Sequence, residues 1–162
     1  MKVWRIATAS PDYHADDLSG EGARRVGGRW NHPGVPIVYA ASSRALAVLE
    51  TVVHLGAASL PQNRYIIEID IPETVWNQRN HHDQQSILRT VPSWDAVPAA
   101  GQSMTFGSVW VQSRAKAVMT APSVIVPVEF VVLINPGLVT TSGITASIDS
   151  KYRYEIAMPR SR

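Results

Sequence analysis

The strongest periodic pattern in the sequence lies between residues 42 and 56. Apolar side chains recur there every three or four positions, which is typical of one face of a helix. They are Leu46, Leu49, Val53 and either Ala45 or Val52. Ser42 or Ser43 can cap the first turn, and Gly56 is of the residue type that commonly ends a helix. The pattern predicts a helix whose apolar face is buried.

Other stretches alternate between apolar and polar residues or are rich in β-branched ones, which predicts strands. They are residues 2–7, 36–41, 64–71 and 144–158, the last with a final strand near 151–155. The apolar run 122–136 predicts a strand buried on both faces, or two strands kinked at Pro127. Together with the helix, these strands predict an α/β (α+β) fold with a mixed β-sheet core.

The remaining stretches are less regular. Residues 107–119 have the spacing of an amphipathic helix. Residues 10–28 are polar and contain glycines, which predicts a loop with one helical turn, and residues 73–106 carry scattered prolines, which predicts irregular structure with short helices. Because no repeat or linker divides the chain, we expect one compact domain over residues 1–162.

Composition excludes several classes of protein. Of 162 residues, 45% are hydrophobic and 17% are charged, which is typical of a folded globular chain. The net charge of +2 gives no indication of nucleic-acid binding, which would need a clustered basic face. The absence of cysteine excludes disulfides, thiolate metal sites and a cysteine nucleophile. No signal-peptide pattern and no apolar run of membrane-spanning length is found, so we expect a cytoplasmic protein without membrane contact.

A few polar residues stand where packing alone does not favour them. Glu50 borders the apolar stripe of the predicted helix, with His54 one turn further on. A carboxylate held there is costly to desolvate unless a group partners it, although it can also reach solvent or pair with Arg44. Arg29 follows Gly27 and Gly28, so it can bind a phosphate or carboxylate, or be an ordinary surface arginine on a glycine turn.

Two further positions are of chemical interest. Ser123 precedes the long apolar run, where its hydroxyl can face a pocket or can satisfy the local backbone. His81, His82 and Asp83 invite a metal assignment, but adjacent histidines rarely converge on one ion. A solvated loop is the better interpretation of that triplet, and the sequence predicts no metal site.

Several of these motifs occur in an order that resembles the RES-domain family. They are Trp4-Arg5-Ile6, Gly27-Gly28-Arg29-Trp30-Asn31, Val38-Tyr39-Ala40-Ala41-Ser42, Ala47-Val48-Leu49-Glu50, Val53-His54, Ala121-Pro122-Ser123 and Leu133-Ile134-Asn135-Pro136. That family supplies the toxins of bacterial type II toxin–antitoxin pairs whose partner is a helix-turn-helix antitoxin of the Xre type. The resemblance covers nearly the whole chain. It weakens after residue 152, so no functional residue is assigned there.

The resemblance implies a fold similar to the ADP-ribosyltransferases, with a cleft in which NAD is bound and its nicotinamide–ribose bond is broken. It implies a toxin that depletes NAD, as a glycohydrolase or phosphorylase, with water or phosphate as the acceptor of ADP-ribose. The implied catalytic residues are Arg29, Tyr39, Glu50 and Ser123. Arg5, Asn31 and His54 are candidates for further NAD contacts. NAD would be a substrate rather than a cofactor, and the implied partners are an Xre-type antitoxin and a second copy of the chain.

Each implied residue has a chemical role. Departure of nicotinamide leaves a cationic ribose, whose charge Glu50 would stabilise in the transition state. Arg29 would bind the pyrophosphate or a ribose, and Tyr39 would stack on nicotinamide or form a wall of the pocket. Ser123 would orient the ribose or the carboxylate.

Three other functions remain open from the sequence. One alternative is an enzyme that transfers ADP-ribose to a cellular protein, with the same residues. An RNA-degrading toxin is compatible with the isoelectric point of about 9.2, although no basic stripe supports direct nucleic-acid binding. In a non-catalytic binding partner, Arg29 and Glu50 would only form a structural ion pair.

Overall fold

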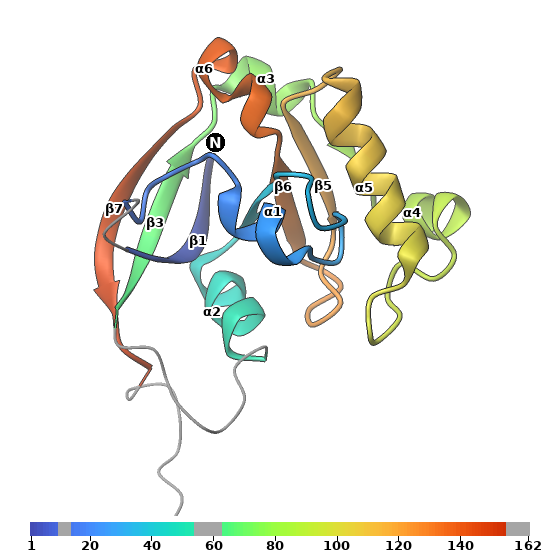
Figure 1. Ribbon diagram of the computed structural model, residues 1–162, viewed down its shortest axis with the longest axis horizontal. Coiled ribbons are helices and arrows are strands. Elements are labelled where there is room, and N and C mark those ends of the chain that lie inside the picture. The colour runs from blue at the N-terminus through green and yellow to red at the C-terminus, as the bar shows by residue number, and fades with distance from the viewer. Residues whose placement is uncertain (10–13, 54–62, 155–162) are drawn as a thin grey trace, which may run out of the picture.

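The computed structural model describes residues 1–9, 14–53 and 63–154, which form a seven-stranded sheet in the order β4-β5-β6-β2-β1-β3-β7 (Figure 1). The strands are β1 (Lys2–Thr8), β2 (Val38–Ala41), β3 (Arg64–Asp70), β4 (Asn80–His81), β5 (Val118–Pro122), β6 (Phe130–Ile134) and β7 (Thr145–Tyr152). Strand β4 pairs with β5 in parallel, and the other pairs are antiparallel. The prediction of an α/β fold with a mixed sheet is confirmed.

The helices lie around this sheet. They are α1 (Glu21–Val26), α2 (Arg44–Val52), α3 (Glu73–Asn77), α4 (Gln84–Thr90), α5 (Gly101–Ser113), the 3-10 helix η1 (Pro136–Leu138) and α6 (Val139–Ser142). In Figure 1, α1 and α2 lie between the strands β7, β3 and β1 on one side of the view and β6 and β5 on the other. None of the helices within the described ranges is long and apolar enough to cross a bilayer.

The sheet is weakest between β1 and β2. Strand β1 pairs with β3 along its whole length, from Lys2 to Thr8. With β2 it is paired in register only at Trp4 and Ala41. The two strands therefore separate on either side of this contact, and the space between them is available for a ligand.

Only the second half of the long apolar run is a strand. Residues 130–134 form β6, whereas residues 123–129 are the turn that connects it to β5, with which it pairs antiparallel. The prediction of a strand along the whole run is therefore wrong, and the kink predicted at Pro127 lies within a complete reversal of the chain. Burial on both faces is correct for β6, because Val132 and Ile134 pack in one core cluster and Val131 and Leu133 in another.

Helix α2 begins as predicted but buries less than its pattern indicates. Ser43 is the N-cap, and its Oγ accepts a hydrogen bond from the Leu46 amide at 3.1 Å. Leu46 is fully buried, whereas Leu49 is 41% and Val53 is 56% exposed. The prediction that these two side chains lie in the core is wrong. For Val53 the reason is that its side chain lines a cavity, whereas Leu49 lies on the surface. Gly56, the predicted end of this helix, lies outside the described residues.

Three further sequence predictions need correction. The helix predicted over 107–119 starts earlier, at Gly101, and ends at Ser113, because Val118 and Met119 belong to β5. His81 lies in β4 rather than in a loop, and its Nδ1 is 2.8 Å from Thr120 Oγ1. The final strand is β7, whereas residues 155–158 lie outside the described part of the chain. The short helices predicted within 10–28 and 73–106 are confirmed by α1, α3 and α4.

Candidate active site

A cavity of about 640 Å³ opens where β1 and β2 separate. Its wall is built from Trp4, Arg5 and Ile6 of β1, Tyr39, Ala40 and Ala41 of β2, Ala47 and Glu50 of α2, residues 27–30, Val97, and residues of β5, β6 and the turn between them. This volume lies within the range of small-molecule sites, which is roughly 300–1,000 Å³. Most of the wall is apolar, so its few charged groups determine which ligand it can orient.

The carboxylate of Glu50 is held by Ser123 across the cavity edge. Ser123 is fully buried, and its Oγ lies 2.7 Å from Glu50 Oε1. Ser123 Oγ also accepts hydrogen bonds from the amides of Ile125 and Val126, at 3.0 and 3.1 Å. Because a hydroxyl has one hydrogen and two lone pairs, its only hydrogen must be donated to Glu50. Of the two alternatives for Ser123, satisfying the local backbone is correct; its hydroxyl does not line the cavity but holds the carboxylate of Glu50, which does.

Arg29 reaches the same cavity from the opposite wall. Its Nη1 donates hydrogen bonds to the carbonyls of Trp94 and Ala96, both at 2.8 Å. Burial lowers the pKa of the Arg29 guanidinium, and the negative charge of Glu50 opposes this shift. A guanidinium has five N–H donors, so three remain for an anionic ligand. The charges of Arg29 and Glu50 thus act on one another.

The ring of Tyr39 forms part of the cavity wall. Its hydroxyl holds residues 27–31, the turn that carries Arg29, which we call the arginine turn. The hydroxyl accepts a hydrogen bond from the Trp30 amide at 2.9 Å and donates one to Asn31 Oδ1 at 2.7 Å. A Cβ on Gly28 would lie only 2.7 Å from this hydroxyl, so glycine is required for the close approach. Burial raises the pKa of Tyr39 above its ordinary value, which keeps the phenol protonated.

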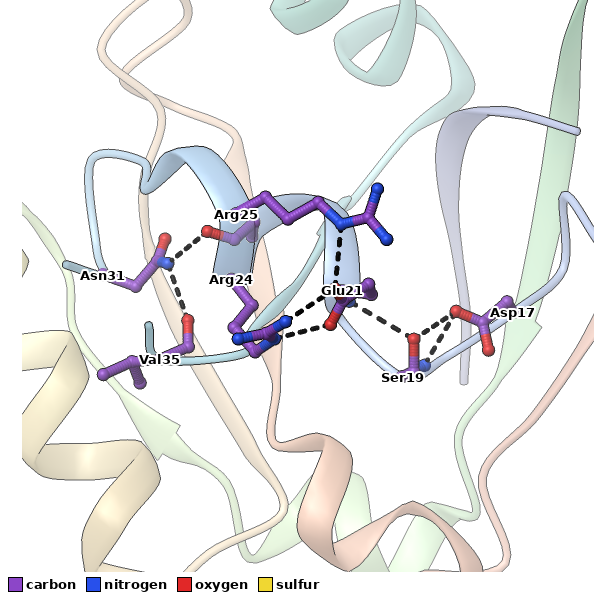
Figure 2. Close-up of polar contacts among 8 residues, drawn as sticks. Asp17, Ser19, Glu21, Arg24, Arg25, Asn31 and Val35 are labelled. Carbon is purple, nitrogen blue, oxygen red and sulfur yellow. Dashed lines mark hydrogen bonds and ion pairs between the residues drawn. The ribbon is translucent and has the colours of Figure 1, made fainter. Parts of the chain in front are cut away.

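Asn31 lies behind Tyr39 and does not line the cavity. It is fully buried, and its amide nitrogen donates to the carbonyls of Ala23 and Val35 at 2.9 and 2.8 Å (Figure 2). These bonds attach the turn that carries Arg29 to α1. The side chain of Asn31 is thereby fully engaged in holding this turn.

Helix α1 carries two arginines close to the cavity, and both are paired. Glu21 accepts hydrogen bonds from Arg24 and Arg25 at 2.6–2.9 Å, as Figure 2 shows. These contacts lower the pKa of Glu21 to about 2. The positive charge on this face is thus partly neutralised, which does not favour binding of a long polyanion.

The structure brings most of the predicted site residues to one place. Arg5, Arg29, Tyr39 and Glu50 line the cavity, and Ser123 lies directly behind Glu50. His54 lies outside the described residues. Sequence reasoning missed two features: Trp4 on the wall, and the loop near Val97 that supplies the carbonyls for Arg29. Trp4 was visible as part of a motif, whereas nothing in the pattern of residues 91–98 indicates this contact.

Similarity to known proteins identifies the family. The model of the RES domain matches residues 2–154. The chain belongs to the RES family. A RES relative from Sphingobium sp. (strain YBL2), named "Prs ADP-ribosylating toxin", is 51% identical over 97% of this chain and 96% of its own length. The resemblance inferred from the sequence motifs is thereby confirmed.

A second RES protein is similar in part of its sequence and in its fold. The NAD(+) phosphorylase MbcT of Mycobacterium tuberculosis is 51% identical over 47 residues, which are 28% of this chain and 25% of MbcT. The crystal structure of the M. tuberculosis MbcT–MbcA toxin–antitoxin complex matches 96% of this chain and 87% of that chain, with a TM-score of 0.68 and 21% identity. This match shows that the two chains share a fold.

No metal site accompanies this cavity in the part of the chain that the structure describes. Residues 1–9, 14–53 and 63–154 contain no group of three or more His, Cys, Asp or Glu side chains placed to hold an ion.

Proposed function

We propose that this RES protein is a toxin that cleaves the nicotinamide–ribose bond of NAD. The observation that carries the proposal is the Glu50 carboxylate at the cavity wall, with one oxygen fixed by Ser123 and the charge of Arg29 nearby. The names of relatives support it independently, because one ADP-ribosylates and another phosphorolyses NAD. NAD is consumed as a substrate in this reaction, and no cofactor is needed.

The chemistry follows from the charge that develops during bond cleavage. The bonding electrons between ribose C1′ and the nicotinamide nitrogen move to that nitrogen and neutralise its positive charge. The ribose then carries an oxocarbenium-like charge, which the carboxylate of Glu50 stabilises. Because the carboxylate of Glu50 lies at the cavity wall and is oriented by Ser123, it would accept a hydrogen bond from a ribose hydroxyl of the bound NAD. Glu50 therefore acts on the transition state more strongly than on NAD itself.

The other charged and aromatic residues bind and orient the dinucleotide. The three remaining N–H donors of Arg29 match phosphate oxygens. Arg5 of β1, whose Nη1 donates to the Asp17 carbonyl, adds a second positive charge at the same cavity. Tyr39 and Trp4 offer aromatic surface to the nicotinamide or adenine ring. The proposed role of Asn31 changes from NAD contact to support of the arginine turn, because its amide is already bonded to backbone carbonyls.

The acceptor of ADP-ribose is the part of the reaction on which the relatives differ. We favour a protein acceptor, since the relative that matches nearly the whole chain is named as ADP-ribosylating Prs. A second candidate is transfer to phosphate. It is supported by the shorter match to the NAD(+) phosphorylase MbcT.

An antitoxin is part of the same proposal. The solved structure with a similar fold holds its toxin in a complex with an antitoxin. By analogy we propose a partner that covers the cavity and excludes NAD, of the helix-turn-helix Xre type, with the RES chain present as a homodimer. The toxin would act in the cytoplasm, where NAD and a protein acceptor are both present.

The test uses purified protein without antitoxin, incubated with NAD labelled in the adenylate moiety. Three parallel reactions contain buffer alone, phosphate, or purified Prs from the host bacterium. Nicotinamide, free ADP-ribose and ADP-ribose phosphate are measured by chromatography, and labelled Prs by gel electrophoresis. Release of nicotinamide in any reaction supports NAD cleavage, and the reaction in which it is fastest identifies the acceptor.

The matched control is Glu50→Gln. The glutamine oxygen still accepts the hydrogen bond from Ser123, so the fold is retained while the negative charge is lost. We expect turnover to fall by about a thousandfold, since electrostatic stabilisation at the reacting centre has effects of that order. If folded wild-type protein released no nicotinamide in all three reactions, or if Glu50→Gln were fully active, the proposal would be wrong.

A further inference from the structure

The turn between β5 and β6, residues 123–129, contacts α2 at both of its ends. At one end, Ser123 donates a hydrogen bond to Glu50. At the other end, the carboxylate of Glu129 accepts a short hydrogen bond from Ser43 Oγ and a longer one, at 3.4 Å, from Ser42 Oγ. The Ser123 amide donates to the Glu129 carbonyl at 2.9 Å, so both contacts belong to one closed turn.

The two points of contact lie on one face of α2. Ser43 and Glu50 are separated by seven positions, which is about two turns at 3.6 residues per turn, so their side chains project in the same direction. Along the helix axis they are roughly 10 Å apart. The turn therefore lies against this face of α2, with Glu129 at the start of the helix and Ser123 two turns further on.

Glu129 acts where the start of α2 is defined. Ser43 Oγ accepts from the Leu46 amide and donates its hydrogen to Glu129, so the capping hydroxyl is held from both sides. Next to it, the Ser42 amide donates to the Phe130 carbonyl at 2.9 Å, and the Phe130 amide donates to Ser42 Oγ at 3.1 Å. A negative charge at a helix N-terminus is also favourable, because the first N–H groups of the helix point toward it.

We propose that Glu129 is a positioning residue for Glu50. It does not line the cavity, so it acts on the reaction through α2 rather than by touching the dinucleotide. By holding Ser43, it fixes the rotation and the axial position of the helix relative to Ser123. The carboxylate of Glu50 is thereby kept at the ribose. This inference rests on the proposed cleavage of NAD.

The kinetic test compares Glu129→Ala and Glu129→Gln with the wild type in nicotinamide release. Alanine removes the acceptor for Ser43, whereas the glutamine oxygen retains it. We expect Glu129→Ala to lower kcat by about 10- to 100-fold with little change in KM, because displacement of a reacting group by about 1 Å has effects of that size. Glu129→Gln should recover most of the lost kcat. Glu73→Ala is the matched control, since it removes an exposed carboxylate from the first turn of α3.

A second measurement does not depend on activity. Amide hydrogen exchange of residues 44–52, recorded without NAD, should be faster in Glu129→Ala than in the wild type and unchanged in Glu73→Ala. Ser43→Gly removes the other partner of the same contact with a residue that is acceptable at an N-cap. This variant should show the same loss of kcat and the same faster exchange, even if Glu129→Ala folds poorly.

The outcomes separate this inference from the proposed function. If the wild type cleaves NAD and Glu129→Ala has the same kcat, the inference is wrong and the proposed function stands. If the wild type does not cleave NAD, the proposed function is wrong. In that case unchanged exchange in α2 of Glu129→Ala would also overturn the role of Glu129 in holding the helix.

Discussion

The carboxylate and the arginine of the candidate site are held in different ways. Glu50 is held by a buried side chain, Ser123, at the end of a central hairpin of the sheet. Arg29 is held by two backbone carbonyls, of Trp94 and Ala96, in a segment without regular secondary structure. One group is thus fixed by the sheet and the other by a loop and a glycine turn.

We call the surroundings of Glu50 the carboxylate half of the site and those of Arg29 the arginine half. The difference in how they are held indicates what each half can do. Bond cleavage needs a charge at one fixed point of the ribose, and the fully bonded Ser123 hydroxyl supplies that precision to Glu50. Binding of a phosphate tolerates small displacements, because charge-assisted hydrogen bonds can form from several donors of Arg29. We therefore expect substitutions near Glu50 to act on kcat, and substitutions near Arg29 to act on stability and KM.

The largest effect is expected where the arginine turn packs on α5. A Cβ on Gly107 would lie 2.0 Å from the Trp30 carbonyl oxygen, so Gly107→Ala must displace the residue next to Arg29. We expect the free energy of unfolding to fall by about 3 kcal/mol. Gly101→Ala, in the same helix but with nothing within 4 Å, should leave it unchanged or slightly raised. Urea denaturation measures both, and equal stabilities would mean that the turn and helix are not tightly packed.

The carboxylate half is tested by Ser123→Ala. Loss of the hydroxyl frees one oxygen of Glu50 and leaves the Ile125 and Val126 amides without this acceptor. We expect kcat for nicotinamide release to fall by about 100-fold, with a smaller change in KM. Ser113→Ala is the control, because it also removes a serine hydroxyl that is bonded to local backbone groups, but at an exposed position at the end of α5. An unchanged kcat would contradict the view that Ser123 orients the carboxylate.

Tyr39→Phe tests whether the hydroxyl mainly holds the arginine turn. Without it, the Trp30 amide and Asn31 Oδ1 each lose a partner in a buried setting. We expect the free energy of unfolding to fall by about 2 kcal/mol, with KM for NAD affected more than kcat. A loss of kcat without a loss of stability would instead place the hydroxyl in the chemistry.

The same substitution should change the dependence of stability on pH. Burial raises the pKa of Tyr39 above 10.0, so above that pH the unfolded chain loses a proton that the folded chain retains. The contribution of Tyr39 to the free energy of unfolding is therefore fully present below pH 10 and is lost as the pH rises further. Burial shifts the pKa of Tyr152 and Tyr154 in the same direction, so Tyr39→Phe should make the decline shallower without abolishing it. An identical slope in both proteins would contradict the shift.

The smallest effect is expected for Arg29→Lys. An ammonium group retains the charge but cannot bind two carbonyls and a phosphate in the planar geometry of a guanidinium. We expect KM for NAD to rise about tenfold, which is the effect of roughly 1.4 kcal/mol. Arg24→Lys, at an exposed position that pairs with Glu21, is the control. A large loss of kcat with unchanged KM would show that the arginine half needs the same precision as the carboxylate half.

Much of the fold could be predicted from the sequence because its signals are local. The Ser43 cap and the alternation in β1 and β3 depend on neighbouring residues, and they were predicted correctly. The hairpin at residues 123–129 was missed, because the apolar run continues through the turn. The turn is produced by the Ser123 hydroxyl bonding to two amides, which composition does not show.

The candidate site was predicted less from pattern than from family resemblance. Local patterns marked Glu50 as misplaced in an apolar helix, but they also predicted burial of Leu49 and Val53 beside it, which is wrong. Periodicity cannot distinguish a helix face that meets the core from one that meets solvent, as at Leu49, or a cavity, as at Val53. The contact between Arg29 and residues 94–96 joins segments far apart in sequence, and such contacts leave no local signal.

The order of these contacts along the chain has a consequence for synthesis. Ser123 lies 73 positions after Glu50, and Glu129 lies 86 positions after Ser43. During translation the carboxylate half therefore cannot assemble until β5, the following turn and β6 have left the ribosome. A nascent chain, or one truncated before residue 123, has Glu50 without the group that aims it. The synthesis of the chain thus includes an interval in which Glu50 exists before the serine that orients it for the proposed cleavage.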